Sequence, residues 1–404
     1  MILEYEEFRQ LFDFPTMIDL DTFKQSVKVK RNQKIMPYTL DEFITRMGDF
    51  RVENREEYWK NLYSICVTNR EETLRAWYDN NISIDDIDKK MFFPLDKNIL
   101  EDNVIFASKQ NKSRIIKNIN FTGVYNTKKY SLSDNMSLLN ELRAMFNDYV
   151  INSNFTVGKQ FNIVLRYDLN GLFALMRGTR HKASIFNPYT YGWMLDNIFE
   201  GERVLAPTAG WNSYQIGFHQ TKNWKEFTCV DVIPSVISNV DKISDFYKSK
   251  DPFQLDVKKA KGYCCPSEKV VLDEPNDYYD LILFGPPYYN LELYDDDNPD
   301  QSSNAYISYE DWLEGYWDAT IQNMIPYLKV DCPFAFCIGN FKNVFGEVGK
   351  EKYNEVDISK DMLDIAKRYL TFDREYILSW GSFTTAKGKA NNNIENLFVL
   401  RKED

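Results

Sequence analysis

The sequence has only two histidines among its 404 residues, and its six cysteines form no Cys-x-x-Cys pair. Zinc sites in proteins are usually built from closely spaced cysteines and histidines, so no metal site is expected. The adjacent pair Cys264 and Cys265 is poorly placed for an ordinary disulfide. The small number of histidines and the lack of Cys-x-x-Cys pairs therefore argue against metal chemistry.

Long apolar runs are also missing, because none approaches the roughly 18 residues that cross a bilayer. The first ten residues, MILEYEEFRQ, are acidic where a secretory signal would be basic and then apolar. We therefore expect a cytoplasmic protein without a membrane partner. The net charge of −11 argues against a chain that coats nucleic acid nonspecifically, since phosphate attraction supplies most of that affinity.

The chain is long enough, and with 44% hydrophobic residues apolar enough, for two domains. We expect a mixed, mainly helical domain over residues 1–175, with target recognition as its possible role. A catalytic domain is expected over residues 176–404. Basic residues cluster twice in the first domain, where they form either solvated surface or a patch facing nucleic acid. They are Lys24, Lys28, Lys30, Arg31 and Lys34, followed by Lys109, Lys112, Arg114, Lys117, Lys128 and Lys129.

From about Gly201, short aliphatic runs alternate with helical stretches, which is typical of an α/β fold with a parallel sheet and crossover helices. A helix is expected where Met362, Ile365, Ala366 and Tyr369 share one face. The last two strands should pair antiparallel, because the segment between them has no helical pattern. Seven strands are predicted, at Arg203–Leu205, Phe227–Asp231, Gly262–Cys264, Leu281–Phe284, Phe334–Ile338, Tyr376–Trp380 and Leu397–Leu400.

The stretch VLAPTAGWNS, residues 204–213, runs from an apolar strand into a turn of small residues. Such a turn at the carboxyl edge of a parallel sheet lets a nucleotide-like ligand approach the backbone. Asp231 ends the next strand 21 positions after Gly210, a spacing at which an acidic side chain reaches ribose hydroxyls. Asp231 could instead, or in addition, cap the helix that follows.

The stretch LILFGPPYYN, residues 281–290, ends a buried strand on two prolines and two tyrosines. Consecutive prolines cannot continue a ladder, so they direct the chain outward in a stiff, extended form. This form would present carbonyl groups and the Tyr288 ring at fixed positions. The arrangement suits a nucleobase drawn out of its stack, with its amine donating to the carbonyl of Gly285 or Pro286.

These residues resemble the S-adenosylmethionine-dependent amino-methyltransferases, particularly the DNA N6-adenine and N4-cytosine enzymes. Their catalytic motif, Asp/Asn/Ser-Pro-Pro-aromatic, is similar to Gly285, Pro286, Pro287 and Tyr288. The resemblance covers roughly residues 180–404 and implies a Rossmann-like seven-stranded sheet with helices on both faces and a terminal antiparallel hairpin. It implies S-adenosylmethionine as cofactor, bound by the following residues: Phe186, Asn187, Ala206, Pro207, Thr208, Gly210 and Asp231.

Two residues depart from the family's pattern. The first motif position normally offers a side-chain oxygen to the target amine, and Gly285 has none. Ala206 replaces the acidic residue that usually leads the cofactor loop. Losing one preorganised partner costs about 10²–10³ in rate, so Gly285 predicts a slow enzyme, another acceptor such as Asn290 or a main-chain carbonyl, or a fold kept for binding. Glycine should also widen the pocket, which would suit a bulkier or already modified base.

Two further groups lie beside the expected site. The acidic loop of residues 294–300 would repel a phosphate backbone or accept a basic target. The aromatic residues Tyr309, Trp312, Tyr316 and Trp317 are expected to pack in the core rather than to stack on a base.

The leading hypothesis is methyl transfer to an exocyclic nucleobase amine, in DNA rather than RNA. The alternatives are a noncatalytic binding or assembly protein with the same fold, and a transferase that moves another group onto a modified base or protein amide.

Overall fold

The computed structural model describes residues 2–31, 34–39, 42, 55–83, 87–96, 98–107, 113–129, 137–152, 182–251, 258–339, 343–345, 353–384 and 390–404. Within these limits the chain divides into two compact units. One comprises Asp86–Asn120 and Ser184–Asp404, and the other comprises Ile2–Asp85 and Phe121–Ala183. The expected domain boundary between residues 175 and 176 lies outside the described residues. The first unit, however, takes in a stretch of the N-terminal part of the chain.

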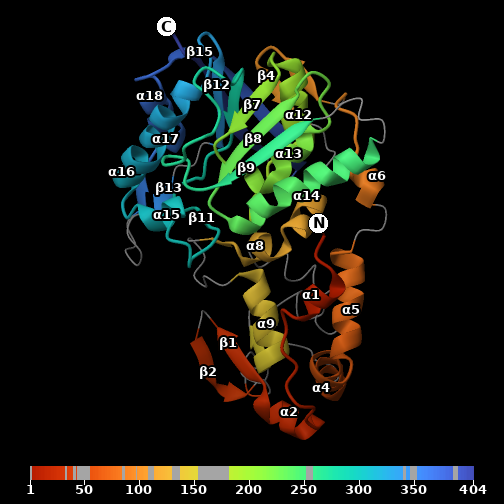
Figure 1. Ribbon diagram of the computed structural model, residues 1–404. Coiled ribbons are helices and arrows are strands. Elements are labelled where there is room, and N and C mark those ends of the chain that lie inside the picture. The colour runs from red at the N-terminus through yellow and green to blue at the C-terminus, as the bar shows by residue number, and fades with distance from the viewer. Residues whose placement is uncertain are drawn as a thin grey trace. The chain divides into compact units, whose positions relative to one another are not determined.

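The first unit is built on a nine-stranded mixed sheet with the order β3-β4-β15-β16-β12-β10-β7-β8-β9 (Figure 1). Strands β7, β8, β9, β10 and β12 are parallel, and β16 is antiparallel to both of its neighbours. The expected α/β fold with a C-terminal antiparallel hairpin is confirmed. The strand bounds are β3 Ile99–Glu101, β4 Val104–Phe106, β7 Arg203–Ala206, β8 Glu226–Asp231, β9 Lys259–Cys264, β10 Leu281–Phe284, β12 Pro333–Gly339, β15 Thr371–Thr384 and β16 Ala390–Arg401.

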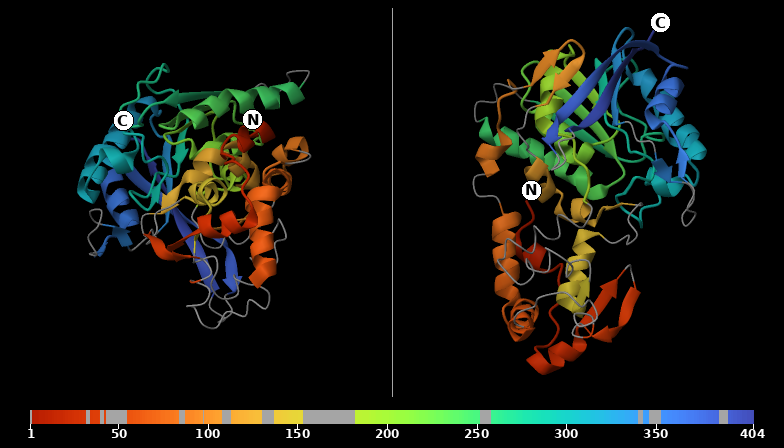
Figure 2. Two further views of the ribbon diagram at one scale, coloured as in Figure 1. Left: turned by 90° about the horizontal axis from the view of Figure 1, so that it is seen from below. Right: turned by 180° about the vertical axis from the view of Figure 1, so that it is seen from behind.

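Two strands of this sheet were not predicted from the sequence. The hairpin of β3 and β4 extends the sheet beyond β15, to which β4 is parallel (Figure 2). Each strand has three residues, and all three side chains of β3 are exposed. Neither alternation nor a long apolar run marks such short strands, which is why the sequence pattern missed them. The N-terminal part therefore contributes to the sheet and is not only a separate helical region.

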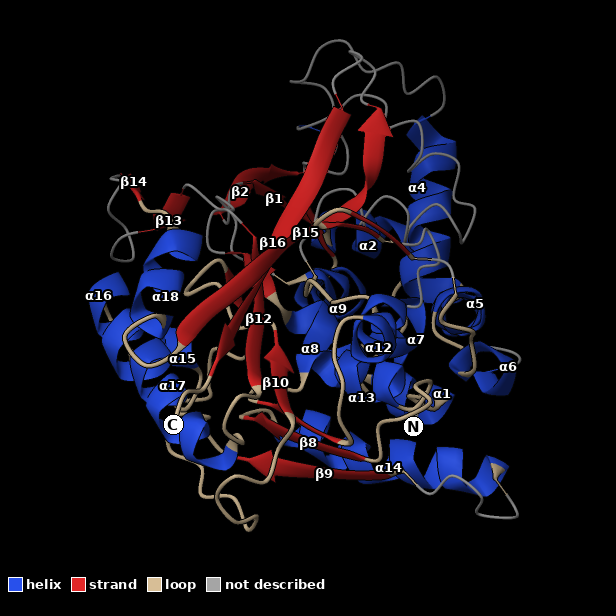
Figure 3. Cartoon of the chain, turned by 90° about the horizontal axis from the view of Figure 1, so that it is seen from above, coloured by secondary structure: helices blue, strands red, loops and turns tan. Residues whose placement is uncertain are grey.

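Helices cover both faces of the sheet, with α12, α13 and α14 on one side and α16, α17 and α18 on the other (Figure 3). The helical elements of this unit are α6 Ile87–Met91, α7 Ser113–Ile119, α12 Pro188–Asn197, η3 Gly210–Asn212, α13 Ser213–Phe218, α14 Pro234–Lys250, α15 Ser302–Ala305, α16 Tyr309–Trp312, η4 Leu313–Asp318, α17 Ala319–Met324, η5 Ile325–Tyr327 and α18 Ile358–Ala366. Short strands are β11 Glu292–Leu293, β13 Asn343–Phe345 and β14 Tyr353–Glu355. None of the helices in the described residues is long and apolar enough to cross a bilayer.

Helix α18 buries Met362, Ile365 and Ala366 as expected. The inclusion of Tyr369 in that face was wrong, because the helix ends at Ala366 and Tyr369 is 39% exposed. The Arg368 N–H donates to the carbonyl of Ile365, three residues earlier, as in a 3₁₀ turn, and this tightens the chain past the helix end. Tyr369 consequently turns outward, and its hydroxyl donates to Asp318.

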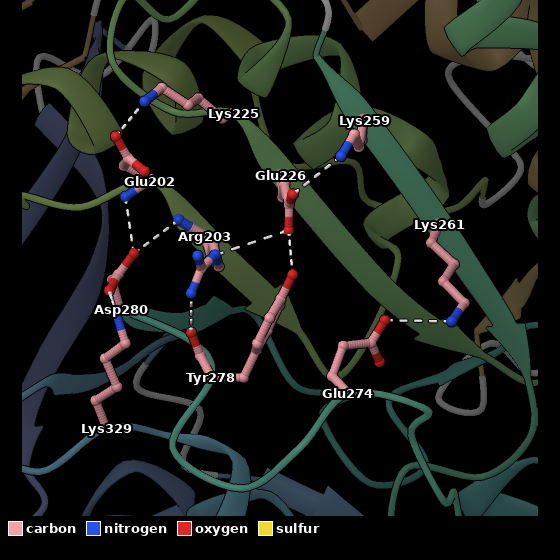
Figure 4. Close-up of polar contacts among 10 residues, drawn as sticks. All are labelled: Glu202, Arg203, Lys225, Glu226, Lys259, Lys261, Glu274, Tyr278, Asp280 and Lys329. Carbon is pink, nitrogen blue, oxygen red and sulfur yellow. Dashed lines mark hydrogen bonds and ion pairs between the residues drawn. The ribbon is translucent and has the colours of Figure 1, made fainter.

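The amino-terminal ends of the parallel strands are joined by a row of opposite charges (Figure 4). Arg203, Glu226 and Lys259 are the first residues of β7, β8 and β9 and stand opposite one another in register. Glu226 lies 3.8 Å from the Arg203 guanidinium and 3.4 Å from Lys259 Nζ, and it accepts the Tyr278 hydroxyl. Beside this row, Asp280 accepts the backbone N–H of Arg203 and pairs with Lys329. A register slip would break these contacts together, so the row helps to fix the strand ends.

The second unit contains helices and a small sheet of order β2-β1-β6. Its core is aromatic and includes Phe8, Phe23 and Trp77. Lys30 of the first basic cluster is buried and lies 3.4 Å from Glu141, so it does not belong to a basic surface. Its elements are α1 Tyr5–Arg9, α2 Leu20–Ser26, β1 Lys28–Arg31, β2 Lys34–Thr39, α4 Arg55–Tyr63, η1 Ser64–Thr68, α5 Arg70–Asn81, α8 Phe121–Asn126, β5 Lys128–Lys129, α9 Leu138–Asp148 and β6 Val150–Asn152.

The second basic cluster does not form one described surface. Lys109 and Lys112 lie outside the described residues, while Lys117 belongs to the first unit and Lys128 to the second.

Candidate functional site

The sheet reverses its order of strands between β7 and β10. From β7 the chain continues outward through β8 and β9, and it then returns to place β10 and β12 on the other side of β7. Loops that leave the carboxyl ends of β7 and β10 therefore diverge. In open α/β sheets ligands bind at this position, outside the carboxyl ends of the strands.

The turn after β7 carries four of the expected cofactor residues. Ala206 is fully buried at the strand end, and Pro207 is buried after it. Thr208 Oγ donates to the Gly285 carbonyl at 3.0 Å, which joins this turn directly to the loop after β10. Gly210 has φ +53°, and a Cβ there would lie 2.5 Å from the Tyr214 ring. Glycine is thus required at 210 by both conformation and space.

Two more left-handed residues follow Gly210, since Trp211 has φ +57° and Asn212 has φ +64°. Buried amides hold this unusual turn in place. Asn120 Nδ2 donates to the Trp211 carbonyl at 2.9 Å, and Asn212 Nδ2 donates to the Val236 carbonyl at 3.0 Å. Asn239 Nδ2 in turn donates to Asn120 Oδ1 at 3.1 Å. The strain of consecutive left-handed residues is tolerated because these hydrogen bonds determine the turn.

Asp231 lies at the carboxyl end of β8, next to the same turn. Its Oδ2 accepts the Ala209 N–H at 3.2 Å, and its Oδ1 accepts the Ile233 N–H at 3.0 Å. Burial raises the pKa of Asp231 to about 6, and hydrogen bonds from the backbone N–H groups of Ile233, Ala209 and Val232 oppose that rise. The alternative that Asp231 caps the next helix does not hold, because Ile233 is the N-cap residue of α14.

The loop after β10 carries the four expected catalytic residues. Pro286 is buried, whereas Gly285, Pro287 and Tyr288 are partly exposed. The Tyr288 hydroxyl accepts the Gly339 N–H at 2.7 Å, which attaches the tyrosine to the end of β12. The next residue, Tyr289, has φ +51°, and its hydroxyl donates to the Ile307 carbonyl. The loop is therefore fixed at both tyrosines, and one lone pair of the Gly285 carbonyl is used by Thr208.

The absence of a side chain at Gly285 does not widen the pocket as expected. A Cβ at this position would lie only 3.0 Å from the Tyr214 hydroxyl oxygen and 3.5 Å from the Cys337 carbonyl oxygen. The Gly285 N–H donates to that same hydroxyl at 2.9 Å. Tyr214 was not among the predicted site residues, and its only signal in the sequence is an aromatic residue four positions after Gly210.

The segment before α12 contains the two remaining cofactor candidates. The Phe186 ring meets the Tyr214 ring edge-on, with centroids 5.9 Å apart. Asn187 is the N-cap of α12, where its side chain accepts the Tyr189 N–H at 3.0 Å. Just upstream, Ser184 donates from both its N–H and its hydroxyl to the buried carboxylate of Glu292, at 3.1 and 2.7 Å. Glu292 thus ties this segment to the chain that follows the catalytic loop.

The acidic loop lies next to the Asp231 turn, because Asn298 Nδ2 donates to the Val232 carbonyl at 2.8 Å. Asp296 and Asp297 are exposed on it. Of the aromatic residues after this loop, Trp312, Tyr316 and Trp317 are buried as predicted, whereas Tyr309 is partly exposed. In the described residues no group of three or more histidine, cysteine or carboxylate side chains is arranged to hold a metal ion.

The sequence matches no protein-family model and no curated protein. Solved structures with a similar fold include S-adenosylmethionine-dependent methyltransferases and also the [4+2]-cyclase SpnF. One from Methanosarcina mazei has 12% identity and a TM-score of 0.33, over 51% of this chain and 95% of its own. The N-methyltransferase NodS from Bradyrhizobium japonicum, solved with S-adenosylhomocysteine, has 12% identity and a TM-score of 0.31, over 50% and 79%.

TrmN from Thermus thermophilus has 11% identity and a TM-score of 0.31, over 54% of this chain and 49% of TrmN. At these values the likeness concerns the arrangement of the elements and does not extend to a substrate.

Proposed function

We propose that this protein is an S-adenosylmethionine-dependent methyltransferase that acts on an exocyclic amine of a nucleobase in DNA, at adenine N6 or cytosine N4. One observation carries the proposal. The turn after β7, Asp231 after β8 and the Gly-Pro-Pro-Tyr loop after β10 share one sheet edge, and direct hydrogen bonds join them. In this proposal the cofactor site and the target site are therefore adjacent.

The residues at this edge fit the cofactor. The Asp231 carboxylate accepts the backbone N–H groups of Ala209, Ile233 and Val232, which leaves one of its about four lone-pair sites for a ribose hydroxyl. The bare Gly210 backbone permits close approach of a ligand to the turn. When bound, S-adenosylmethionine supplies an electrophilic methyl group. Ala206 leaves the cofactor without the acidic partner usual at that position, so Asp231 is the main anchor.

The target side of the site would work by orientation. A base stacked on the Tyr288 ring would bring its amine toward the carbonyl groups of the Pro-Pro segment. Hydrogen bonds from the amine to these acceptors move its nitrogen toward tetrahedral geometry and direct its lone pair at the methyl group. The amine would take the methyl group as the methyl–sulfur bond breaks and S-adenosylhomocysteine leaves, and it would then release one proton to water, so no titratable base is required. The second unit, with Lys24, Lys28 and Lys34 at its surface, would contribute to target recognition.

The first test is calorimetric titration with S-adenosylmethionine and S-adenosylhomocysteine, followed by transfer of a labelled methyl group to unmodified DNA. Micromolar binding of both ligands and label in N6-methyladenine or N4-methylcytosine are expected. Asp231→Ala should weaken both cofactor affinities by at least about tenfold, because the anchor for the ribose is removed. Absence of binding at millimolar ligand would refute the proposal and favour a noncatalytic role. Label in protein alone would refute the nucleobase target.

A further inference from the structure

Gly285 has no conformational need to be glycine. Its φ lies outside the left-handed region that favours this residue, in contrast to Gly210 at +53°. The obstacle to a side chain is spatial, because the nearest atom to an added Cβ would be the Tyr214 hydroxyl oxygen at 3.0 Å. In an asparagine or aspartate at this position, the side-chain oxygen would lie about 2.4 Å from Cβ. The Tyr214 hydroxyl oxygen is therefore nearly as close to the Cβ position as the side-chain oxygen of an asparagine or aspartate would be.

The Tyr214 ring is held firmly at this position. It stacks on Tyr191 with centroids 4.5 Å apart and planes inclined by 22°, and it is 3% exposed. Gly210 makes room for it, since any side chain at 210 would meet the ring. An acceptor placed in this way needs little reorganisation when a substrate arrives, which is the property of an effective catalytic hydrogen-bonding group.

The chemistry of the hydroxyl is suitable for accepting a hydrogen bond. Burial raises the pKa of Tyr214 above its usual range, so the group remains a phenol at neutral pH. The oxygen accepts the Gly285 N–H at 2.9 Å, which uses one of its two lone pairs. The Thr208 side chain also hydrogen-bonds to this hydroxyl. Because Thr208 donates its own proton to the Gly285 carbonyl, the phenolic proton goes to Thr208, and the second lone pair of the Tyr214 oxygen is left for a further donor.

We propose that the Tyr214 hydroxyl accepts one of the two N–H groups of the target amine, beside the one accepted by a carbonyl of the Pro-Pro segment, and replaces the side-chain oxygen that Gly285 lacks. This inference rests on the proposed methyltransferase function and assigns a catalytic residue to it. It also accounts for the pairing of the two residues, because a side chain at 285 and a hydroxyl at 214 compete for one space. A neutral hydroxyl accepts more weakly than a carboxylate, so transfer should be slower than with an aspartate there.

The test compares steady-state methyl transfer to DNA by wild type and Tyr214→Phe. The variant should lower kcat by about 10²–10³, as expected for loss of one preorganised partner, with Kd for S-adenosylmethionine changed by less than about threefold. Tyr191→Phe is the matched control. It removes a hydroxyl from the same ring stack, one that donates to the Leu283 carbonyl at 3.0 Å, and it should leave kcat within about threefold.

A swap of positions provides the decisive comparison. Gly285→Asn alone should lower kcat, because its side chain meets the Tyr214 hydroxyl. Gly285→Asn combined with Tyr214→Phe should recover at least about tenfold of the activity that Tyr214→Phe loses, because the amide oxygen can take the vacant place. Recovery is an effect that a purely structural role of Tyr214 would not produce.

Thermal unfolding checks the spatial argument without relying on activity. Gly285→Ala should lower Tm in the wild-type background and lower it less in the Tyr214→Phe background. If Gly285→Ala lowered Tm equally in the wild-type and Tyr214→Phe backgrounds, the argument that the two side chains compete for one space would be overturned. A wild-type kcat retained by Tyr214→Phe would overturn the catalytic assignment while methyl transfer itself stood. Absence of transfer by the wild type would refute the proposed function, and the catalytic role of Tyr214 with it.

Discussion

At the residue scale, the charge of Asp231 sets a pH limit on the proposed cofactor site. Its pKa is raised from 3.8 to about 6 because the carboxylate is buried, so the free protein loses this charge as the pH falls below about 6. A ribose hydroxyl would donate to the ionised form and stabilise it. Affinity for S-adenosylhomocysteine should therefore be constant above pH 7 and fall below pH 6, by up to about tenfold per unit.

The pH dependence of folding stability has the opposite sign to that of cofactor affinity. A carboxylate with a raised pKa in the folded state contributes stability at low pH that is lost as the pH rises through about 6. Asp231→Asn should weaken cofactor binding, and its affinity should no longer vary between pH 5 and 7. The amide has only one acceptor oxygen, whereas both carboxylate oxygens accept backbone N–H groups, so the variant should also lower Tm, and by less at pH 7.5 than at pH 5. Calorimetry across this range measures both. An unchanged affinity in the variant would remove Asp231 from the site.

The ring and the hydroxyl of Tyr288 have separate tasks. Tyr288→Phe keeps the stacking face but leaves the Gly339 N–H without its acceptor, so it should cost about 1–3 kcal/mol of stability and reduce transfer only modestly. Tyr288→Ala also removes the face and should reduce kcat by more than about 100-fold, with cofactor affinity retained. Chemical denaturation and transfer assays separate the two effects. Equal kcat values for the two variants would contradict a stacking role.

Sequence alone could identify the residues of the site that belong to local motifs. The turn around Gly210, Asp231 and the Gly-Pro-Pro-Tyr loop each follow a recognisable strand, and parallel strands bring their carboxyl ends to one edge. Tyr214 and Asn120 could not be found in this way. Their roles depend on where a helix side chain lies after packing, and nothing in spacing or composition encodes the 3.0 Å approach of a hydroxyl to position 285.

At the element scale, the left-handed turn of η3 depends on amides from other elements. Asn120 follows α7 and makes hydrogen bonds to Trp211, Asn212 and Asn239. Asn120→Ala would leave the Trp211 carbonyl and the Asn239 amide short of partners, each costing about 1–3 kcal/mol. We expect Tm to fall and cofactor affinity to fall with it, because the turn lines the proposed site. Ser238→Ala, an exposed neighbour of Asn239, is the control and should change neither. A normal affinity in Asn120→Ala would show that the turn is held without this amide.

The strands illustrate why element prediction succeeded for one part of the chain only. The buried run of β10 is found with the predicted bounds, since four consecutive apolar residues next to prolines leave no alternative. Strands β15 and β16 are longer than predicted because an antiparallel hairpin pairs residues whatever their polarity, as Ser379 with Ile394. Strands β3 and β4 form because β4 pairs with the edge of β15, and such a contact between distant parts of the chain cannot be predicted from local sequence.

At the scale of the whole molecule, the first unit needs two stretches of chain that are far apart in the sequence. Residues Asp86–Asn120 supply β4, whose Val104, Ile105 and Phe106 pair with β15. They also supply the Met91 carbonyl, which accepts the buried Tyr247 hydroxyl at 2.8 Å. We therefore expect that cutting the chain at the expected boundary between residues 175 and 176 does not leave a complete first unit.

A fragment of residues 176–404 should aggregate or bind no S-adenosylmethionine. It would expose the edge of β15, a template for pairing with another chain, and leave the turn at Gly210 without Asn120. The matched chain joins residues 86–120 to 184–404 by a flexible Gly-Ser linker and should be monodisperse and bind the cofactor. Size-exclusion chromatography and calorimetry on both chains measure this difference. If fragment 176–404 were monodisperse and bound S-adenosylmethionine as tightly as the full chain, the stretch from 86 to 120 would be an addition to the unit and not a part of its fold.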